Sequence, residues 1–239
     1  MILSRAKSGA VAKLGAAAVL FATMVLTGGG PDTSRPRNDM RAAGKHGVVV
    51  TQEPHATAVG LEVLRKGGNA VDAAVAVALT LAVTFPQAGN LGGGGFMVVR
   101  QPNGAVATID FRERAPKAAS RDMYLKPDGS VDTDKVQFGV TAAGVPGSPA
   151  GLMHALQKFG TKSLPELAAP AIRFAGEGFV VDAFLARSLA AKQKQLQRFE
   201  ASRDIFFANE APLKQGDVLV QKDLAATLQR FATKGTKGF

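Results

Sequence analysis

Residues 70–85 (AVDAAVAVALTLAVTF) are the stretch that most restricts how this chain folds. Asn69 precedes them as a helix cap and Pro86 follows as a helix stop, so they predict one helix. Apart from Asp72 and two threonines, every side chain of that helix is apolar. A helix that is apolar all round has to be covered on most sides, and this one is too short and too rich in alanine to span a membrane. The segment therefore predicts a core helix in a layered protein that combines helices and sheet.

The segments on either side of this helix supply candidate strands. Residues 47–52 (GVVVTQ) are almost all apolar and β-branched, which predicts a strand buried on both faces. Residues 54–66 predict a helix that ends at Gly67 and Gly68. Residues 96–101 and 105–111 read as two strands, and the Pro-Asn-Gly sequence between them predicts a hairpin.

Four consecutive glycines, Gly92 to Gly95, raise the question of a nucleotide site. Phosphate-binding loops run from a strand through the glycines into a helix, because the helix N-terminus faces the anion. Here the helix comes first and a strand follows. No Lys-Ser or Lys-Thr pair comes after Gly95, and no acidic residue has the spacing of a dinucleotide fingerprint. We therefore expect these glycines to let the backbone pass close to a neighbour, either for tight packing or as the wall of a ligand site.

The second half of the chain reads mainly as helices. They are predicted at residues 149–159, 164–175, 182–199 and 222–234, the second with a capping box of Ser163 and Glu166. Residues 122–135 read as a surface loop. His55, at a helix start, and His154, on an apolar helix, are expected to be structural, although a ligand role for His55 stays open.

Composition argues against several classes of protein. The 239 residues include no cysteine and only three histidines, none at metal-ligand spacing, so neither a disulfide framework nor a zinc site is expected. The net charge of +10 is spread along the chain, with one tyrosine and no tryptophan to stack on bases. We therefore expect no nucleic acid partner, and no cofactor or metal.

The beginning of the chain has the pattern of an export signal. Residues 1–30 place Arg5, Lys7 and Lys13 before an apolar run at 14–26, followed by small residues. We predict a signal peptide at 1–30, an exposed linker at 31–46 and one partial domain at 47–239. We therefore expect a secreted or periplasmic protein that is not stably inserted in the membrane after processing. The alternative is that the segment remains as an uncleaved membrane anchor.

The end of the second predicted strand carries a charged cluster, residues 110–116 (DFRERAP). Strand ends hold side chains rigidly, so such a cluster is a candidate binding site. Surface ion pairs alone are the simpler alternative.

Several blocks in order now resemble one family. The stretches GGNAVDAAVAVALTLAVTFPQAGNLGGGGFMVV, IDFRERAP and AAGVPGSPAG, then IFFANEAPLKQGDVLVQKDLAATLQRFA, resemble the large subunit of γ-glutamyltransferases (γ-glutamyl transpeptidases). The resemblance runs from about residue 47 to the end. It implies the N-terminal nucleophile hydrolase fold, a four-layer α/β/β/α sandwich of α+β class that is incomplete in this chain.

The resemblance also implies a reaction. In this family a precursor cleaves itself into a large and a small subunit, and the new N-terminal threonine of the small subunit attacks the γ-glutamyl amide of glutathione. The γ-glutamyl group then passes to water, amino acids or peptides. The sequence ends within what resembles the family's GFYxG segment, so we expect a truncated large subunit whose small-subunit partner is absent.

Only one site residue is carried over from the family. Arg112 matches the arginine that binds the α-carboxylate of the γ-glutamyl donor, and a guanidinium fits a carboxylate in two-pronged fashion. Arg114 is a weaker candidate, and Asp110 and Glu113 are expected to orient or neutralise the cluster. No catalytic residue is expected in this chain, and Thr51, Thr80 and Thr141 are internal and are not expected to act as nucleophiles.

Two alternatives remain open from the sequence. Relatives of this family act as cephalosporin (glutaryl) acylases, whose donors also carry a carboxylate. A non-catalytic fragment is the other possibility.

Overall fold

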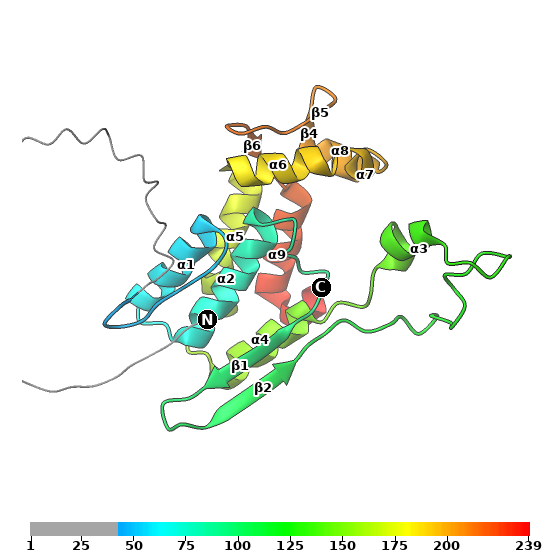
Figure 1. Ribbon diagram of the computed structural model, residues 1–239. Helices are drawn as coiled ribbons and strands as arrows, with labels where there is room; N and C mark the ends of the chain where they lie inside the picture. The colour runs from blue at the N-terminus through cyan, green and yellow to red at the C-terminus, as the bar shows by residue number, and fades with distance from the viewer. Residues whose placement is uncertain (1–42) are drawn as a thin grey trace, which may run out of the picture. The chain divides into compact units, whose positions relative to one another are not determined.

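Helix α2 (Ala70–Thr84) is the centre of the fold in the computed structural model, which describes residues 43–239 (Figure 1). The Asn69 side chain accepts from the N–H groups of Val71 and Asp72, and the Asp72 carboxylate accepts from Asn69 N–H in return. Most of the helix surface is buried, including Val71, Ala73, Val75, Leu79 and Val83, and the one remaining stripe, Ala74, Val77, Ala78 and Leu81, is partly buried. The predicted core helix and its cap are confirmed.

Four further helices surround α2. They are α1 (Pro54–Arg65), α4 (Ser148–Phe159), α5 (Leu164–Glu177) and α9 (Lys222–Lys234). Helices α1, α4 and α5 contact α2, and α9 packs on α5 (Figure 1). The buried Gln221 side chain donates from Nε2 to the carbonyl of Val83 at 2.9 Å, which joins the start of α9 to the end of α2. Burial of the apolar faces of these helices is the main source of stability.

The ends of these helices agree with the sequence prediction, with one difference. Helix α1 is followed by Gly67, which has a φ of 81° that favours glycine. At α5, Ser163 Oγ accepts from Glu166 N–H, but the Glu166 carboxylate lies 3.5 Å from Lys162 Nζ. The capping box is therefore half formed, because the glutamate pairs with a neighbouring lysine.

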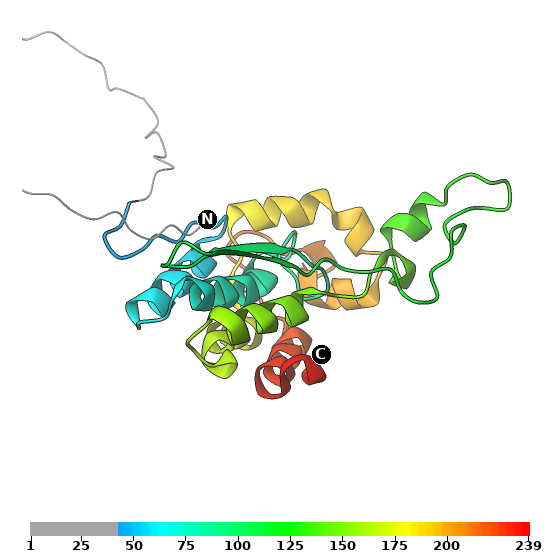
Figure 2. The same ribbon diagram turned by 90° about the horizontal axis from the view of Figure 1, so that it is seen from below.

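Strands β1 (Phe96–Arg100) and β2 (Val106–Asp110) form the predicted antiparallel hairpin, with Val98 opposite Thr108. Figure 2 shows the hairpin with α2 and α4 along one of its faces. Met97, Val99 and Ile109 pack against the core on that face. The opposite face is open: Phe96 is 67% exposed, Val98 71% and Val106 62%.

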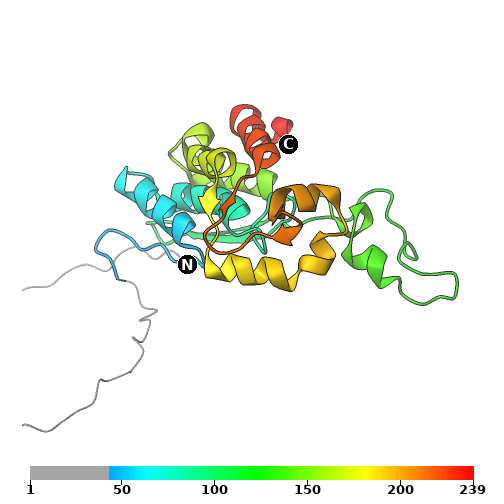
Figure 3. The same ribbon diagram turned by 90° about the horizontal axis from the view of Figure 1, so that it is seen from above.

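The predicted long helix at 182–199 is wrong. The chain forms α6 (Ala183–Ala191), capped by Asp182, and then the short helices α7 (Gln193–Leu196) and α8 (Glu200–Phe206) (Figure 3). Leu185 and Leu189 of α6 are buried, but the next turn would place Lys192 and Gln193 toward the core. Polar side chains at that point do not hold the helix against its neighbours, so α6 ends at Ala191, with Lys192 as its C-cap.

Short elements complete the fold. Strand β3 (Phe179–Val180) pairs with β6 (Val218–Leu219), and β4 (Phe207–Ala208) pairs with β5 (Ala211–Pro212). The other elements are α3 (Thr133–Gln137) and the 3₁₀ turns η1 (Val140–Ala142) and η2 (Gly235–Gly238).

The predicted strand at 47–52 is also wrong. These residues form neither helix nor strand, and Val50 is 53% exposed. A strand needs a neighbour with which to exchange hydrogen bonds, and none of the strands within residues 43–239 pairs with this segment. Contacts divide the chain into two units, Met1–Val50 and Thr51–Phe239, and the second contains every helix and strand within residues 43–239.

The predicted signal peptide at 1–30 and most of the linker at 31–46 lie outside the described residues. Within residues 43–239, no helix is both long enough and apolar enough to cross a membrane. The described part of the chain is of α+β class, with helices on one face of a two-stranded sheet.

Residues 115–144 form an arm that leaves the end of β2 and carries α3 (Figure 1). Arg198, after α7, holds it: the guanidinium makes a two-pronged ion pair with Asp134 at 2.5 and 3.0 Å and lies 4.5 Å from the ring centre of Phe138. The hydrogen bond from Arg198 lowers the pKa of Asp134, and the same contact raises the pKa of Arg198. The pair therefore stays charged across the neutral pH range.

Arg198→Ala is expected to free the arm. Because the contact is exposed, the effect is modest, and we expect trypsin to cut after Lys135, the neighbour of Asp134 in α3, about two- to fivefold faster. Mass spectrometry of a digestion time course measures this rate. Arg187→Ala, an exposed arginine on α6, is the matched control. Equal cleavage rates in the two variants would contradict the role of Arg198.

Candidate functional site

Arg112 lies two residues beyond the end of β2, in the segment Phe111–Arg114. Its side chain is 61% exposed, and Nη2 lies 3.2 Å from Glu113 Oε1. The guanidinium carbon is 5.9 Å from the ring centre of Phe96, on the open face of the hairpin. A guanidinium carries five N–H donors, so this arrangement leaves donors for a carboxylate ligand.

The two acidic neighbours hold Arg112 in different ways. Asp110 Oδ1 accepts from the backbone N–H of Arg112 at 3.0 Å, while Glu113 contacts the guanidinium itself. A hydrogen bond from its own backbone N–H, and then one from Arg112, hold the pKa of Glu113 below its usual value. Glu113 is therefore ionised at neutral pH and balances part of the arginine's charge.

Backbone hydrogen bonds hold the segment at both ends. Phe111 and Gly95 exchange two bonds, at 3.0 and 3.4 Å, which extend the hairpin by one pair. Arg114 and Val145 exchange two more, at 3.1 and 2.8 Å. The backbone of Arg112 is thus held between two antiparallel pairs.

A cleft of about 490 Å³ lies beside β2 and above α4. Its basic lining residues are Arg112, Arg114, His154 and Lys158, and Asp110 lines it as well. His154 is exposed there, so its prediction as a structural histidine among apolar neighbours is wrong. The lining is suited to an anionic ligand, since cations outnumber carboxylates in it.

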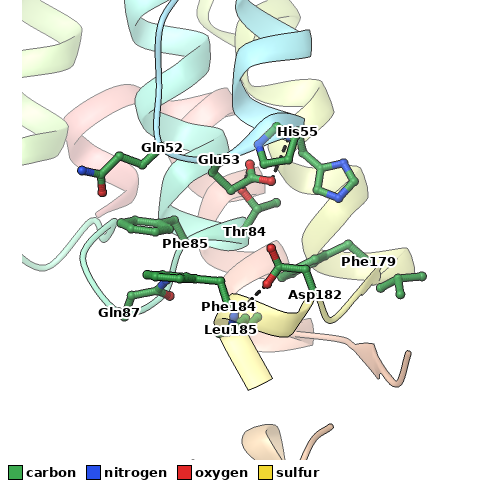
Figure 4. A pocket seen from close by; sticks show the side chains of 12 residues that line it. Gln52, Glu53, His55, Thr84, Phe85, Gln87, Phe179, Asp182, Phe184 and Leu185 are labelled. Carbon is green, nitrogen blue, oxygen red and sulfur yellow. Dashed lines mark hydrogen bonds between the residues drawn. The ribbon is translucent and has the colours of Figure 1, made fainter. Parts of the chain in front are cut away.

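A second cavity, of about 80 Å³, lies at the start of α1 (Figure 4). Glu53, buried in its wall, accepts from the N–H groups of His55 and Ala56 and from Thr84 Oγ1. Glu53 is therefore the cap of α1, and the His55 ring packs 4.9 Å from that of Phe174. A space of this size holds a few water molecules and not a peptide substrate.

The three threonines considered above as possible nucleophiles are engaged in local hydrogen bonds. Thr51, Thr80 and Thr141 donate from Oγ1 to the carbonyls of Glu53, Ala76 and Lys135 respectively. None of them lines the cleft beside Arg112. Within residues 43–239, no group of three or more histidine, aspartate or glutamate side chains is arranged to hold a metal ion.

The order of the residues does not by itself predict that His154, Lys158 and the turn at 144–151 border the same cleft as Arg112. The signal was present in the glycines of that turn (AAGVPGSPAG), which permit a close approach to another backbone. Which segment they approach depends on long-range packing.

Comparison with known proteins places these observations in a family. The family profile described as Gamma-glutamyltranspeptidase matches residues 56–239. The glutathione hydrolase proenzyme of Escherichia coli (strain K12) is 47% identical over 196 residues, which are 82% of this chain and 34% of that protein. The acylase ACY 1 proenzyme of Pseudomonas sp. (strain V22) is 37% identical over 81% of this chain and 36% of that protein.

A solved structure shows the same fold. The Helicobacter pylori gamma-glutamyltranspeptidase superposes with a TM-score of 0.81 at 42% identity, over 83% of this chain and 57% of that one. The chain spans about a third of the length of the two curated proenzymes named above. Since the profile covers most of the chain and the fold agrees, the chain belongs to the gamma-glutamyltranspeptidase family.

Proposed function

We propose that this chain is the donor-binding part of a glutathione hydrolase, an enzyme that cleaves the γ-glutamyl amide of glutathione. Arg112 binds the α-carboxylate of the γ-glutamyl donor, and Glu113 sets the guanidinium in place. The observation that carries the proposal is the exposed guanidinium on a backbone held at both ends, beside a cleft with a basic lining. The names of the relatives support the reaction class.

The reaction needs a nucleophile from outside these 239 residues. We propose the threonine of a small subunit, whose hydroxyl attacks the γ-glutamyl carbonyl while its own α-amine accepts the hydroxyl proton. The amide bond breaks, the protonated amine leaves, and a γ-glutamyl ester remains. Water, an amino acid or a peptide then takes the γ-glutamyl group from the ester. The word proenzyme in the names of the relatives supports this processing.

The open face of the hairpin supports a small-subunit partner. Phe96, Val98 and Val106 expose an apolar surface on a sheet of only two strands. Such a sheet is marginal in water and its apolar face favours contact with another layer. We propose that the small subunit covers this face and completes the sandwich. The leader pattern at 1–30 supports a secreted or periplasmic location.

Turnover of γ-glutamyl-p-nitroanilide tests the proposal. The 239-residue chain alone is expected to be inactive. A chimeric precursor, in which residues 56–239 replace the matching part of the Escherichia coli relative, is expected to process itself and release nitroaniline. Turnover by the chain alone, or a processed chimera without turnover, would contradict it.

The acylase relative favours one alternative, a glutaryl acylase, because a glutaryl group also presents a carboxylate to Arg112. Turnover of glutaryl-p-nitroanilide by the same chimera, compared with turnover of γ-glutamyl-p-nitroanilide, distinguishes a glutaryl acylase from a glutathione hydrolase. We expect the γ-glutamyl compound to be preferred, and preference for glutaryl would favour the alternative.

A further inference from the structure

We infer that Gly94 and Gly147 are positioning residues that set the backbone of Arg112, and through it the guanidinium that receives the donor carboxylate. The inference rests on the proposed role of Arg112 and adds two residues to it. Neither glycine touches the guanidinium in the described structure; both act on the backbone that carries it.

The first observation is the contact between Gly94 and the Arg112 backbone. A Cβ on Gly94 would lie 2.5 Å from Glu113 N, 2.5 Å from Phe111 O and 2.6 Å from Arg112 Cα. Real Cβ atoms essentially never come that close, and backbone atoms on either side of Arg112 have little room to give way. The φ of Gly94 lies outside the left-handed region, so the missing side chain is what the site requires.

The second observation comes from the turn before α4, which contacts the same segment. A Cβ on Gly147 would overlap Phe111 O, and one on Gly151 would overlap the Phe111 side chain. The glycine loop and the turn before α4 thus both pack directly on the backbone of Phe111 and Arg112. They are also tied to each other, since Gly147 N–H and Ser148 N–H both donate to Gly93 O, at 2.8 and 3.0 Å.

These contacts explain the run of glycines. Gly92 has only Asn90 Oδ1 within reach, at 4.0 Å, whereas Gly95 would meet the edge of the Phe111 ring at 3.0 Å. The need for glycine therefore varies along the loop and is strongest at Gly94, the residue that faces Arg112 Cα. A methyl group there has to displace the Arg112 backbone, which moves the guanidinium away from the position in which it would receive the donor carboxylate.

The test compares one substitution at neighbouring positions. Gly94→Ala in the chimeric precursor is expected to raise the KM for γ-glutamyl-p-nitroanilide about tenfold with kcat changed less than about twofold. Gly92→Ala, the same change in the same loop, is expected to leave both constants unaltered. Gly95→Ala is expected to give a smaller rise in KM than Gly94→Ala. It replaces Gly94→Ala as the test variant if Gly94→Ala prevents processing of the precursor.

A double-mutant cycle separates positioning from general damage. If Gly94 acts through Arg112, Gly94→Ala has no further effect on KM in an Arg112→Gln background. An equal rise in both backgrounds would overturn the inference. Equal KM values for the Gly92→Ala and Gly94→Ala variants would also overturn it. If Gly94→Ala prevents processing, equal KM values for Gly92→Ala and Gly95→Ala would do the same.

Failure of the proposed function looks different. If Arg112→Gln alone leaves KM unchanged, the role of Arg112 is wrong whatever the glycine variants do. If Arg112→Gln raises KM and the glycine variants do not, only the positioning role is lost.

Discussion

Asp72→Asn is expected to lower the free energy of unfolding of this chain by about 3 kcal/mol. Asp72 is fully buried at the start of α2 and accepts hydrogen bonds from Asn69 N–H, from Thr161 N–H and Oγ1, and from Lys162 N–H, at 2.7 to 3.0 Å. It thereby ties α2 to the turn between α4 and α5. An asparagine puts an NH₂ group against donors, so at least one buried N–H loses its acceptor.

Thermal unfolding followed by circular dichroism measures this loss. For a chain of this size we expect the midpoint to fall by about 6–12 °C. Asp122→Asn, a surface aspartate paired only with Arg121, is the control and should stay within about 2 °C. Equal midpoints for the Asp72 and Asp122 variants would show that the buried hydrogen bonds carry no net stability.

The same residue predicts a dependence on pH. Burial by itself raises the pKa of Asp72, but the hydrogen bonds from Thr161, Asn69 and Lys162 outweigh burial and hold the pKa below its usual value. A carboxyl with a depressed folded pKa contributes its stability above the unfolded pKa, near 4, and loses it as pH falls through the folded pKa. The difference in free energy of unfolding between wild type and Asp72→Asn should therefore have its full size at pH 7 and become smaller below about pH 4.

Arg112→Gln is expected to reduce kcat/KM for the γ-glutamyl donor by about a hundredfold or more in the chimeric enzyme, mostly through KM. The glutamine keeps a polar side chain but loses the charge and the two-pronged fit to a carboxylate. It also leaves Glu113 without its cationic partner, so an anion faces the donor's carboxylate. Steady-state kinetics with γ-glutamyl-p-nitroanilide give both constants.

Two companion variants make this result specific. Arg112→Lys keeps the charge without the planar fork and should fall between wild type and Arg112→Gln. Arg114→Gln removes a cation from the same cleft and should have the smaller effect, within about fivefold, because Arg114 is the weaker candidate for the carboxylate. A larger loss from Arg114→Gln than from Arg112→Gln would transfer the proposed role to Arg114.

Local signals in the sequence were enough for the elements whose ends are determined by nearby residues. The Asn69 cap and Pro86 limit α2, the Pro-Asn-Gly turn sets the hairpin, and α9 has the predicted bounds of 222–234. Local signals failed at 47–52 and at 182–199. The first segment has the composition of a strand but no partner strand among residues 43–239. In the second, the polar Lys192 and Gln193 stand where the next helical turn after Leu189 would meet the core.

The sequence by itself determined the family blocks, the core helix and the choice of Arg112, because each depends on residue types a few positions apart. Only the tertiary structure decided what the glycines at 92–95 contact, and that the Glu53 side chain caps α1. Gly94 and Gly147 are more than fifty residues apart in the sequence, yet both lie in close contact with the backbone around Arg112. Such contacts arise only when the helices and the hairpin pack together, because glycine is required only where neighbouring atoms occupy the space that a Cβ would fill.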